Sequence, residues 1–188
     1  MHQQLKISVS ILQIIRGKSE MGQLVRSEEV LAELRDQGLL ESEDFGPKTD
    51  WKPFLEQALT ENPDLKRVSG RKGIPYYFSV QSLSETYARI LVLKSEDPLW
   101  LIAEVVRENS QLYPRPVPVD SFREPPFELT REEIAECLVT MGEQKEFQDI
   151  AQTITSIGTL FLYSTQHLEP DHAFALAEWL DVGQVGNP

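Results

Sequence analysis

The chain has 188 residues, of which 40% are hydrophobic and 26% are charged, and its formal net charge is −12. These proportions are typical of a folded chain and argue against extended disorder. No stretch approaches the roughly 18 consecutive apolar residues that a membrane-spanning helix requires, and the first residues lack the pattern of a secretory signal. Cys137 is the only cysteine, which excludes a disulfide framework within one chain. We therefore expect a cytoplasmic protein without a membrane segment.

The negative charge is distributed unevenly along the chain. Residues 1–82 carry 11 Lys and Arg against 12 Asp and Glu, whereas residues 83–188 carry 7 against 18. The distribution of charge says more about a nucleic-acid partner than its sum does. We expect two domains, a nearly neutral one over 1–82 and an acidic helical one over 83–188. No sequence repeat at a fixed period is evident.

The first 61 residues predict three helices and one short strand. Apolar residues at helical spacing predict a helix from Leu5 to Arg16, and residues 17–22 predict a break before a short strand at 23–26. Ser27 is expected to cap the second helix.

The third helix is predicted over residues 50–61 and has the clearest amphipathic pattern in the chain. Asp50 suits its N-cap, and Pro53 is tolerated in its first turn. Its buried face is expected to be formed by Trp51, Phe54, Leu55, Ala58 and Leu59.

Residues 65–80 predict a β-hairpin with a basic tip. Two β-prone segments flank the turn at residues 69–73, and Pro75 restricts the second strand to an edge or to its first residues. Four positive charges fall within seven positions, with no acidic residue among them: Lys66, Arg67, Arg71 and Lys72. Such a tip contacts phosphates, binds a protein partner or keeps a loop solvated, and the sequence leaves the three interpretations open.

The second half predicts mainly helices. Residues 113–128 are rich in proline and form either a linker or a strap packed across a domain. Thr130 begins a helix with a capping box, and apolar spacing predicts a further helix over residues 147–157. A strand at 159–164 and a last helix after Glu169 complete the chain.

No residue pattern points to catalysis or to a cofactor. His167, Glu169, Asp171 and His172 are of metal-binding type, but no cysteine or second histidine cluster completes a site. Cys137 lies on an apolar helix face and is expected to be a buried small hydrophobe. We expect a protein that is not an enzyme and that holds neither a cofactor nor a metal.

The order helix, strand, helix, helix and hairpin over residues 5–80 resembles the winged helix-turn-helix superfamily. In its DNA-binding members the third helix enters the major groove and the hairpin, or wing, touches the backbone or the minor groove. The resemblance implies contact with double-stranded DNA through residues 48–73. The implied contact residues are Lys48, Lys52, Gln57, Lys66, Arg67, Arg71 and Lys72. Glu56 and Glu61 depart from the pattern, because carboxylates facing phosphates weaken binding.

The expected fold class is mainly α with small β-hairpins, an N-terminal winged helix being followed by a helical domain. That second domain is a second winged helix, a dimerisation or ligand domain, or a continuation of the first fold. The resemblance implies a DNA-binding transcriptional regulator whose acidic half binds a second copy or a protein partner. The alternative is a protein–protein interaction subunit with tandem winged-helix-like domains that does not bind DNA.

Overall fold

The computed structural model describes residues 2–40 and 51–183, and the chain folds as two compact units, Met1–Val92 and Leu93–Pro188. We call these the first and the second unit. Both are mainly helical, and each contains a three-stranded antiparallel sheet. The division falls inside a helix, α4 (Glu85–Glu96), which follows the predicted boundary at residue 82.

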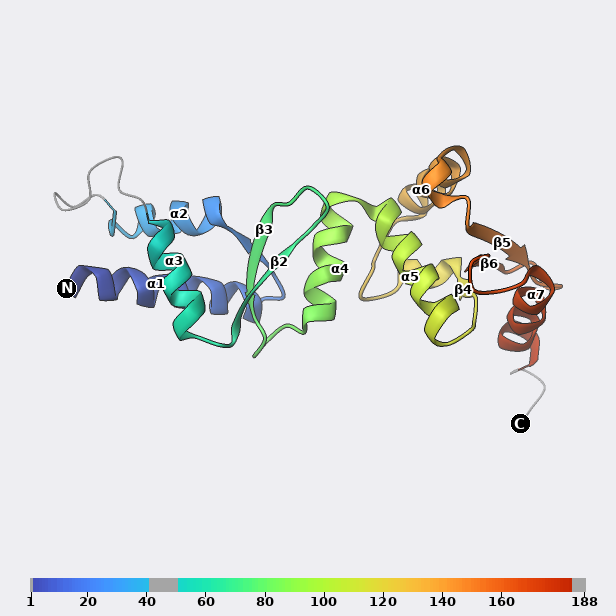
Figure 1. Ribbon diagram of the computed structural model, residues 1–188, viewed down its shortest axis with the longest axis horizontal. Coiled ribbons are helices and arrows are strands. Elements are labelled where there is room, and N and C mark those ends of the chain that lie inside the picture. The colour runs from blue at the N-terminus through green and yellow to red at the C-terminus, as the bar shows by residue number, and fades with distance from the viewer. Residues whose placement is uncertain (1, 41–50, 184–188) are drawn as a thin grey trace. The chain divides into compact units, whose positions relative to one another are not determined.

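In the first unit, helices pack beside a sheet whose strand order is β1-β3-β2 (Figure 1). Its elements are α1 (His2–Glu20), β1 (Val25–Arg26), α2 (Ser27–Asp36), α3 (Lys52–Glu61), β2 (Leu65–Ser69), β3 (Pro75–Ser79) and the start of α4. The core brings together side chains of all three helices and of the sheet, among them Ile11, Val30, Leu55 and Tyr77. Pro75 is the first residue of β3, as its lack of a backbone N–H requires.

In the second unit the strand order is β4-β6-β5. Its elements are α5 (Pro98–Leu112), β4 (Val117–Pro118), the 3₁₀-helix η1 (Val119–Arg123), α6 (Arg131–Glu143), the 3₁₀-helix η2 (Lys145–Phe147), β5 (Ile150–Ile154), β6 (Leu160–Ser164), α7 (Pro170–Glu178) and the π-helix η3 (Trp179–Gly183). The proline-rich segment supplies β4 and η1, and Phe122 within it is fully buried. Residues 113–128 therefore include a strap packed within the unit.

Four polar side chains tie α1 to the hairpin of the first unit. Arg16 donates two hydrogen bonds to the carboxylate of Asp64, from Nε at 2.9 Å and from Nη2 at 2.7 Å. Ser79 Oγ donates to the same carboxylate at 2.8 Å, and the backbone N–H of Ser79 donates to Ser19 Oγ at 2.9 Å. The helix and the base of the hairpin are thus joined through one aspartate.

The second unit contains the same arrangement. Arg107 donates to Asp149 from Nε at 2.9 Å and from Nη2 at 2.6 Å, and Ser164 Oγ donates to Asp149 at 2.8 Å. The backbone N–H of Ser164 donates to Ser110 Oγ at 3.0 Å. We call the two sets of side chains the arginine–aspartate–serine networks.

The hairpins match residue for residue as well. The pairing runs from Leu65↔Ser79 to Ser69↔Pro75 in one unit, and from Ile150↔Ser164 to Ile154↔Leu160 in the other. A glycine with positive φ precedes the second strand in both turns, at +70° and +89°, a conformation that other residues rarely adopt. Further identical pairs follow at the same shift of 85 in residue number: Gln81 and Gln166, Leu83 and Leu168, Ala88 and Ala173.

The two units are therefore structural repeats, which a search for a sequence repeat at a fixed period does not reveal. The arginine and the aspartate of the network are 48 residues apart in the first unit and 42 residues apart in the second. Because this spacing differs, no single period aligns the two halves of the repeat, and the similarity becomes evident only when the buried contacts are compared.

Two predicted elements are corrected by the structure. Helix α1 continues through Gly17 to Glu20, where a break was expected, because Arg16 and Ser19 are both held in the network. The helix expected over residues 147–157 is instead η2 followed by strand β5. Its helical apolar spacing is outweighed by the pairing of β5 with β6, and Ile154 and Ile157 remain 60% and 65% exposed.

The network of the second unit is expected to contribute strongly to stability. Asp149→Ala should lower the free energy of unfolding of that unit by roughly 2–3 kcal/mol, because Arg107 and Ser164 lose their shared partner. Asp120, whose side chain is 78% exposed beside Arg123, provides the matched control. Asp120→Ala should cost less than about 0.5 kcal/mol. Urea denaturation followed by circular dichroism measures both, and equal losses would contradict the role assigned to Asp149.

Acid should weaken both units through the same two carboxylates. Hydrogen bonds from Arg16 and Arg107, followed by those from the serines, hold the pKa of Asp64 and of Asp149 below the ordinary value of 3.8. At a pH near 3.8 and below, the unfolded chain therefore binds more protons than the folded chain. The stabilisation by these two carboxylates is complete well above pH 3.8 and is lost as the pH falls through the folded pKa values.

The urea midpoint should therefore fall between about pH 5 and about pH 2.5. In the variant carrying Asp64→Asn and Asp149→Asn, the urea midpoint should fall less steeply with decreasing pH than in the unmodified protein. A slope identical to that of the unmodified protein would contradict the assignment to these two groups.

Candidate nucleic-acid interface

The structure places the predicted contact residues on one helix and on the hairpin of the first unit. Lys52 and Gln57 lie on α3, Lys66 and Arg67 on β2, and Arg71 and Lys72 in the turn that follows. All six are exposed. Lys48 lies outside the described residues, as does Asp50.

The exposed face of α3 is engaged by its own neighbours. Gln57 Nε2 donates to Glu61 at 2.7 Å, so its amide is held along the helix. Glu56 forms an ion pair with Arg67 of β2, whose guanidinium also lies 5.6 Å from the centre of the Tyr77 ring. The charge of Arg67 is thereby matched by a carboxylate, which sequence spacing did not indicate.

A hollow of about 510 Å³ lies between the hairpin and the start of α4. Lys66, Arg67 and Phe78 line it from the hairpin, and Glu85 and Arg89 line it from the helix. Arg89 is a cation that the sequence argument did not include. The sequence could have indicated Arg89, because this residue lies on the first helix after the hairpin, one turn beyond Glu85, and is exposed.

The corresponding turn of the second unit has a different chemistry. The repeat pairs Arg71 with Ser156 and Lys72 with Ile157, so the basic tip is absent. Ser156 donates hydrogen bonds from its backbone and its hydroxyl to the carboxylate of Glu178, and Thr155 Oγ1 donates to Asp181 at 2.6 Å. Only the first of the two hairpins therefore has a basic turn. The turn of the second hairpin is hydrogen-bonded to α7 and η3.

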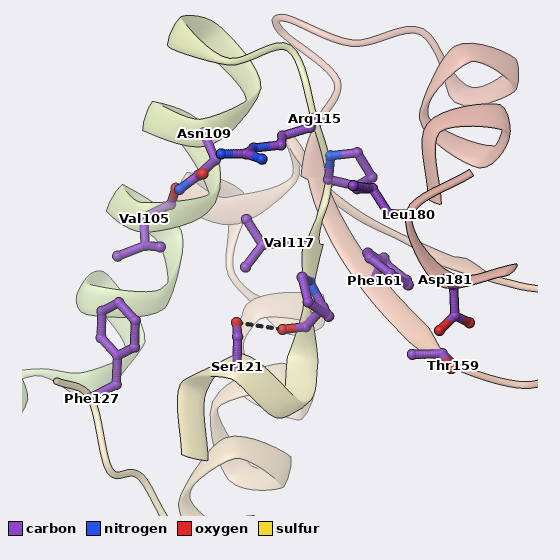
Figure 2. A pocket seen from close by; sticks show the side chains of 12 residues that line it. Val105, Asn109, Arg115, Val117, Ser121, Phe127, Thr159, Phe161, Leu180 and Asp181 are labelled. Atoms are coloured by element: carbon purple, nitrogen blue, oxygen red, sulfur yellow. Dashed lines mark hydrogen bonds between the residues drawn. The ribbon is translucent and has the colours of Figure 1, made fainter. Parts of the chain in front are cut away.

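The second unit contains a pocket of about 500 Å³ (Figure 2). Apolar side chains of α5, β4 and β6 line it, with Val105, Val117 and Phe161 among them. Arg115 reaches it from the strap, with its guanidinium 5.4 Å from the centre of the Tyr113 ring.

The described residues offer no cluster of three or more His, Cys, Asp or Glu that would hold a metal ion. Nor does any helix among them have the length and apolar content needed to cross a membrane. Cys137 is half-buried, and burial, followed by the negative charges of Asp97 and Glu133, raises the pKa of its thiol to about 11. The thiol is therefore protonated at neutral pH, which argues against a nucleophilic role.

Comparison with known proteins finds a family model that matches the second unit and a relative that matches a longer part of the chain. Residues 94–185 match the family model described as the YdhW C-terminal domain, a range that coincides closely with the second unit. The chain is also similar to the uncharacterized protein YdhW of Escherichia coli (strain K12), with 31% identity over 137 residues. The matched region is 71% of this chain and 64% of the relative, so the chain spans less than two thirds of the relative's length. No solved structure matches.

Cys137 should react slowly with thiol reagents. The rise in pKa from 9.0 to about 11 lowers the thiolate fraction at pH 8 by about 100-fold relative to an unperturbed cysteine. Alkylation by iodoacetamide, followed by mass spectrometry, should show this slowing in the folded protein and an ordinary rate in urea. A folded-state rate close to that of free cysteine would contradict the assignment.

Proposed function

We propose that the first unit is a winged-helix domain and that its wing, β2, β3 and the turn between them, binds the phosphate backbone of double-stranded DNA. The order α1, β1, α2, α3, β2, β3 and the strand order β1-β3-β2 support the fold assignment. The cluster of exposed cations on the hairpin is the observation that carries the binding proposal.

The wing offers several phosphate contacts in one place. Lys66, Arg67, Arg71 and Lys72 stand on the hairpin, and Arg89 lines the hollow beside two of them. Four phosphate contacts correspond to a slope of roughly 3.6 in log affinity against log salt concentration. Binding of this kind is modest and strongly dependent on salt.

The third helix takes a smaller part in this proposal than the superfamily resemblance implies. Gln57 is already bonded to Glu61, and Glu56 holds Arg67 close to the helix. A base contact by Gln57 would first have to break its bond to Glu61. The proposed binding is therefore directed at the backbone and has little preference for sequence.

The second unit is not part of the proposed DNA surface. Most of the chain's negative charge lies in residues 83–188, and the second hairpin has no cation in its turn. A domain of this charge is repelled by the phosphate backbone. We propose that the second unit makes contacts with molecules other than DNA.

A charge reversal at the wing tip tests the proposal. The full-length variant with Arg71→Glu and Lys72→Glu should bind a fluorescent random duplex far more weakly at low salt, and its salt slope should fall by roughly 1.8 because two contacts are lost. The matched control reverses two exposed cations of the second unit, Arg123→Glu and Lys145→Glu. Fluorescence anisotropy measures both. Absence of salt-dependent binding by the unmodified protein, or equal effects of the two variants, would overturn the proposal.

Removal of the carboxylate at Glu56 should have the opposite effect. Glu56→Gln frees Arg67 from its ion pair and is expected to tighten duplex binding by about twofold to fivefold. Glu28→Gln, at an exposed position in the first turn of α2, makes the same change in net charge and should have a smaller effect. If Glu28→Gln tightens binding as much, the gain comes from net charge and Arg67 has no specific role.

One observation favours a second candidate function, that of a protein-interaction subunit. Several large apolar side chains of the second unit are exposed, with Ile154 60%, Ile157 65% and Trp179 62% exposed. Exposed apolar side chains of this size are common at protein interfaces. Affinity purification from the source cell should then recover a partner that the variant Ile157→Asp does not retain, and recovery of this chain alone would count against this function.

A further inference from the structure

The repeat shows what covers one face of the first helix in the first unit. Lys18 of α1 pairs with Glu33 of α2 at 3.1 Å, and Ile14 of α1 shares a buried cluster with Val30 and Leu34 of α2. Helix α2 therefore lies over the face of α1 that carries Ile14 and Lys18.

The same face is open in the second unit. A shift of 91 residues takes Arg16 to Arg107 and Ser19 to Ser110, and it takes Ile14 and Lys18 to Val105 and Asn109. Both of these counterparts line the 500 Å³ pocket of Figure 2. In place of the ten-residue α2, the chain forms the five-residue η1 there.

The shortened element explains why the pocket exists. Phe122 of η1 is fully buried, as Val30 of α2 is, so the start of the missing helix is replaced in the core. The later turns of α2 have no helical counterpart, since the chain proceeds from η1 to the start of α6 at Arg131. A hollow of this volume lies within the range of about 300–1,000 Å³ that is typical of small-molecule sites.

The pocket has an apolar floor and polar side chains on two sides. Val105, Val117 and Phe161 offer an apolar floor. Figure 2 shows Arg115 beside Asn109 on one side of the hollow and Asp181 beside Thr159 on the other. Arg115 is the only cationic side chain among the lining residues, and a guanidinium binds a carboxylate through paired hydrogen bonds.

The position of Arg115 is supported by its own neighbours. Its guanidinium lies 5.4 Å from the ring centre of Tyr113, and its backbone N–H donates to the carbonyl oxygen of Asn109 at 3.4 Å. Asp181 is held on the other side by the hydrogen bond from Thr155 Oγ1 at 2.6 Å. The negative charge of Asp181 disfavours a second carboxylate at that side.

We propose that this hollow binds small monocarboxylates with an apolar body, the carboxylate contacting Arg115 and the body lying on Val105, Val117 and Phe161. The site belongs to the second unit and does not depend on DNA binding by the first. It assigns a ligand site to the region that matches the YdhW C-terminal domain.

The test is a titration of the full chain with three probes of matched shape or charge. The probes are 4-phenylbutyrate, the neutral 4-phenylbutanol and the dicarboxylate suberate, and binding is followed by ¹H–¹⁵N NMR shifts. We expect saturable binding of 4-phenylbutyrate with shifts at the backbone amides of Val105, Val117 and Phe161. The neutral and the dicarboxylate probes should bind about tenfold more weakly.

Arg115→Gln should weaken the binding of 4-phenylbutyrate by about tenfold and leave that of 4-phenylbutanol unchanged. Arg115 is exposed, so this substitution leaves the core intact, and Arg123→Gln at another exposed position of the same unit is the matched control. Val105→Phe should fill the hollow and weaken the binding of both phenyl probes.

Three results would overturn the proposal that the hollow binds a carboxylate through Arg115. They are the absence of saturable binding by 4-phenylbutyrate, an affinity unchanged by Arg115→Gln, and shifts that fall outside the hollow. Suberate binding as tight as that of 4-phenylbutyrate would overturn the restriction to monocarboxylates. If Val105→Phe fails to fold, the exposed Arg115→Gln variant still decides the outcome.

Discussion

A single partly buried aspartate in each unit holds a helix against the base of a hairpin, and the rest of the unit is arranged around it. Asp64 directly precedes β2, and it joins Arg16 of α1 to Ser79 at the end of β3. A paired guanidinium–carboxylate contact fixes direction as well as distance. The helix therefore crosses the sheet in one orientation, and the turn between β2 and β3 is presented on one side. Asp149 has the same role in the second unit.

The two units retain this framework but differ in the surfaces that it supports. The first has a ten-residue α2 and a basic hairpin turn, whereas the second has the five-residue η1, a pocket beside α5 and an uncharged turn. Loss of a partly buried ionic partner is costly, while exposed positions tolerate substitution with little loss of stability. This difference explains why the two units are alike inside and unlike outside, and why DNA binding and ligand binding are proposed for different units.

The net charge of −12 gives a poor account of the first unit. Four of its cations lie together on one hairpin, and the tertiary structure decides which groups lie beside each of them. Glu56 lies on α3 and Arg67 on β2, 11 residues apart, and only the packing of helix on strand brings them into contact. Arg89 joins the same surface because α4 follows the hairpin closely. The proposed interface therefore differs from the one that the sequence predicted, with less weight on α3 and more on the wing.

The sequence by itself determined the elements whose signals are local. The hairpin around residues 69–73, the third helix, the capping box at Thr130 and the strand at 159–164 all follow from turn residues, caps and apolar spacing over a few positions. Only the tertiary structure decided the continuation of α1 through Gly17, the strand at Ile150–Ile154 and the repeat itself. Each of these depends on groups that are 42 or more residues apart or on pairing with a neighbouring strand. Local propensities are small, so a partly buried ion pair or a strand partner outweighs them, and neither is visible in a short window of sequence.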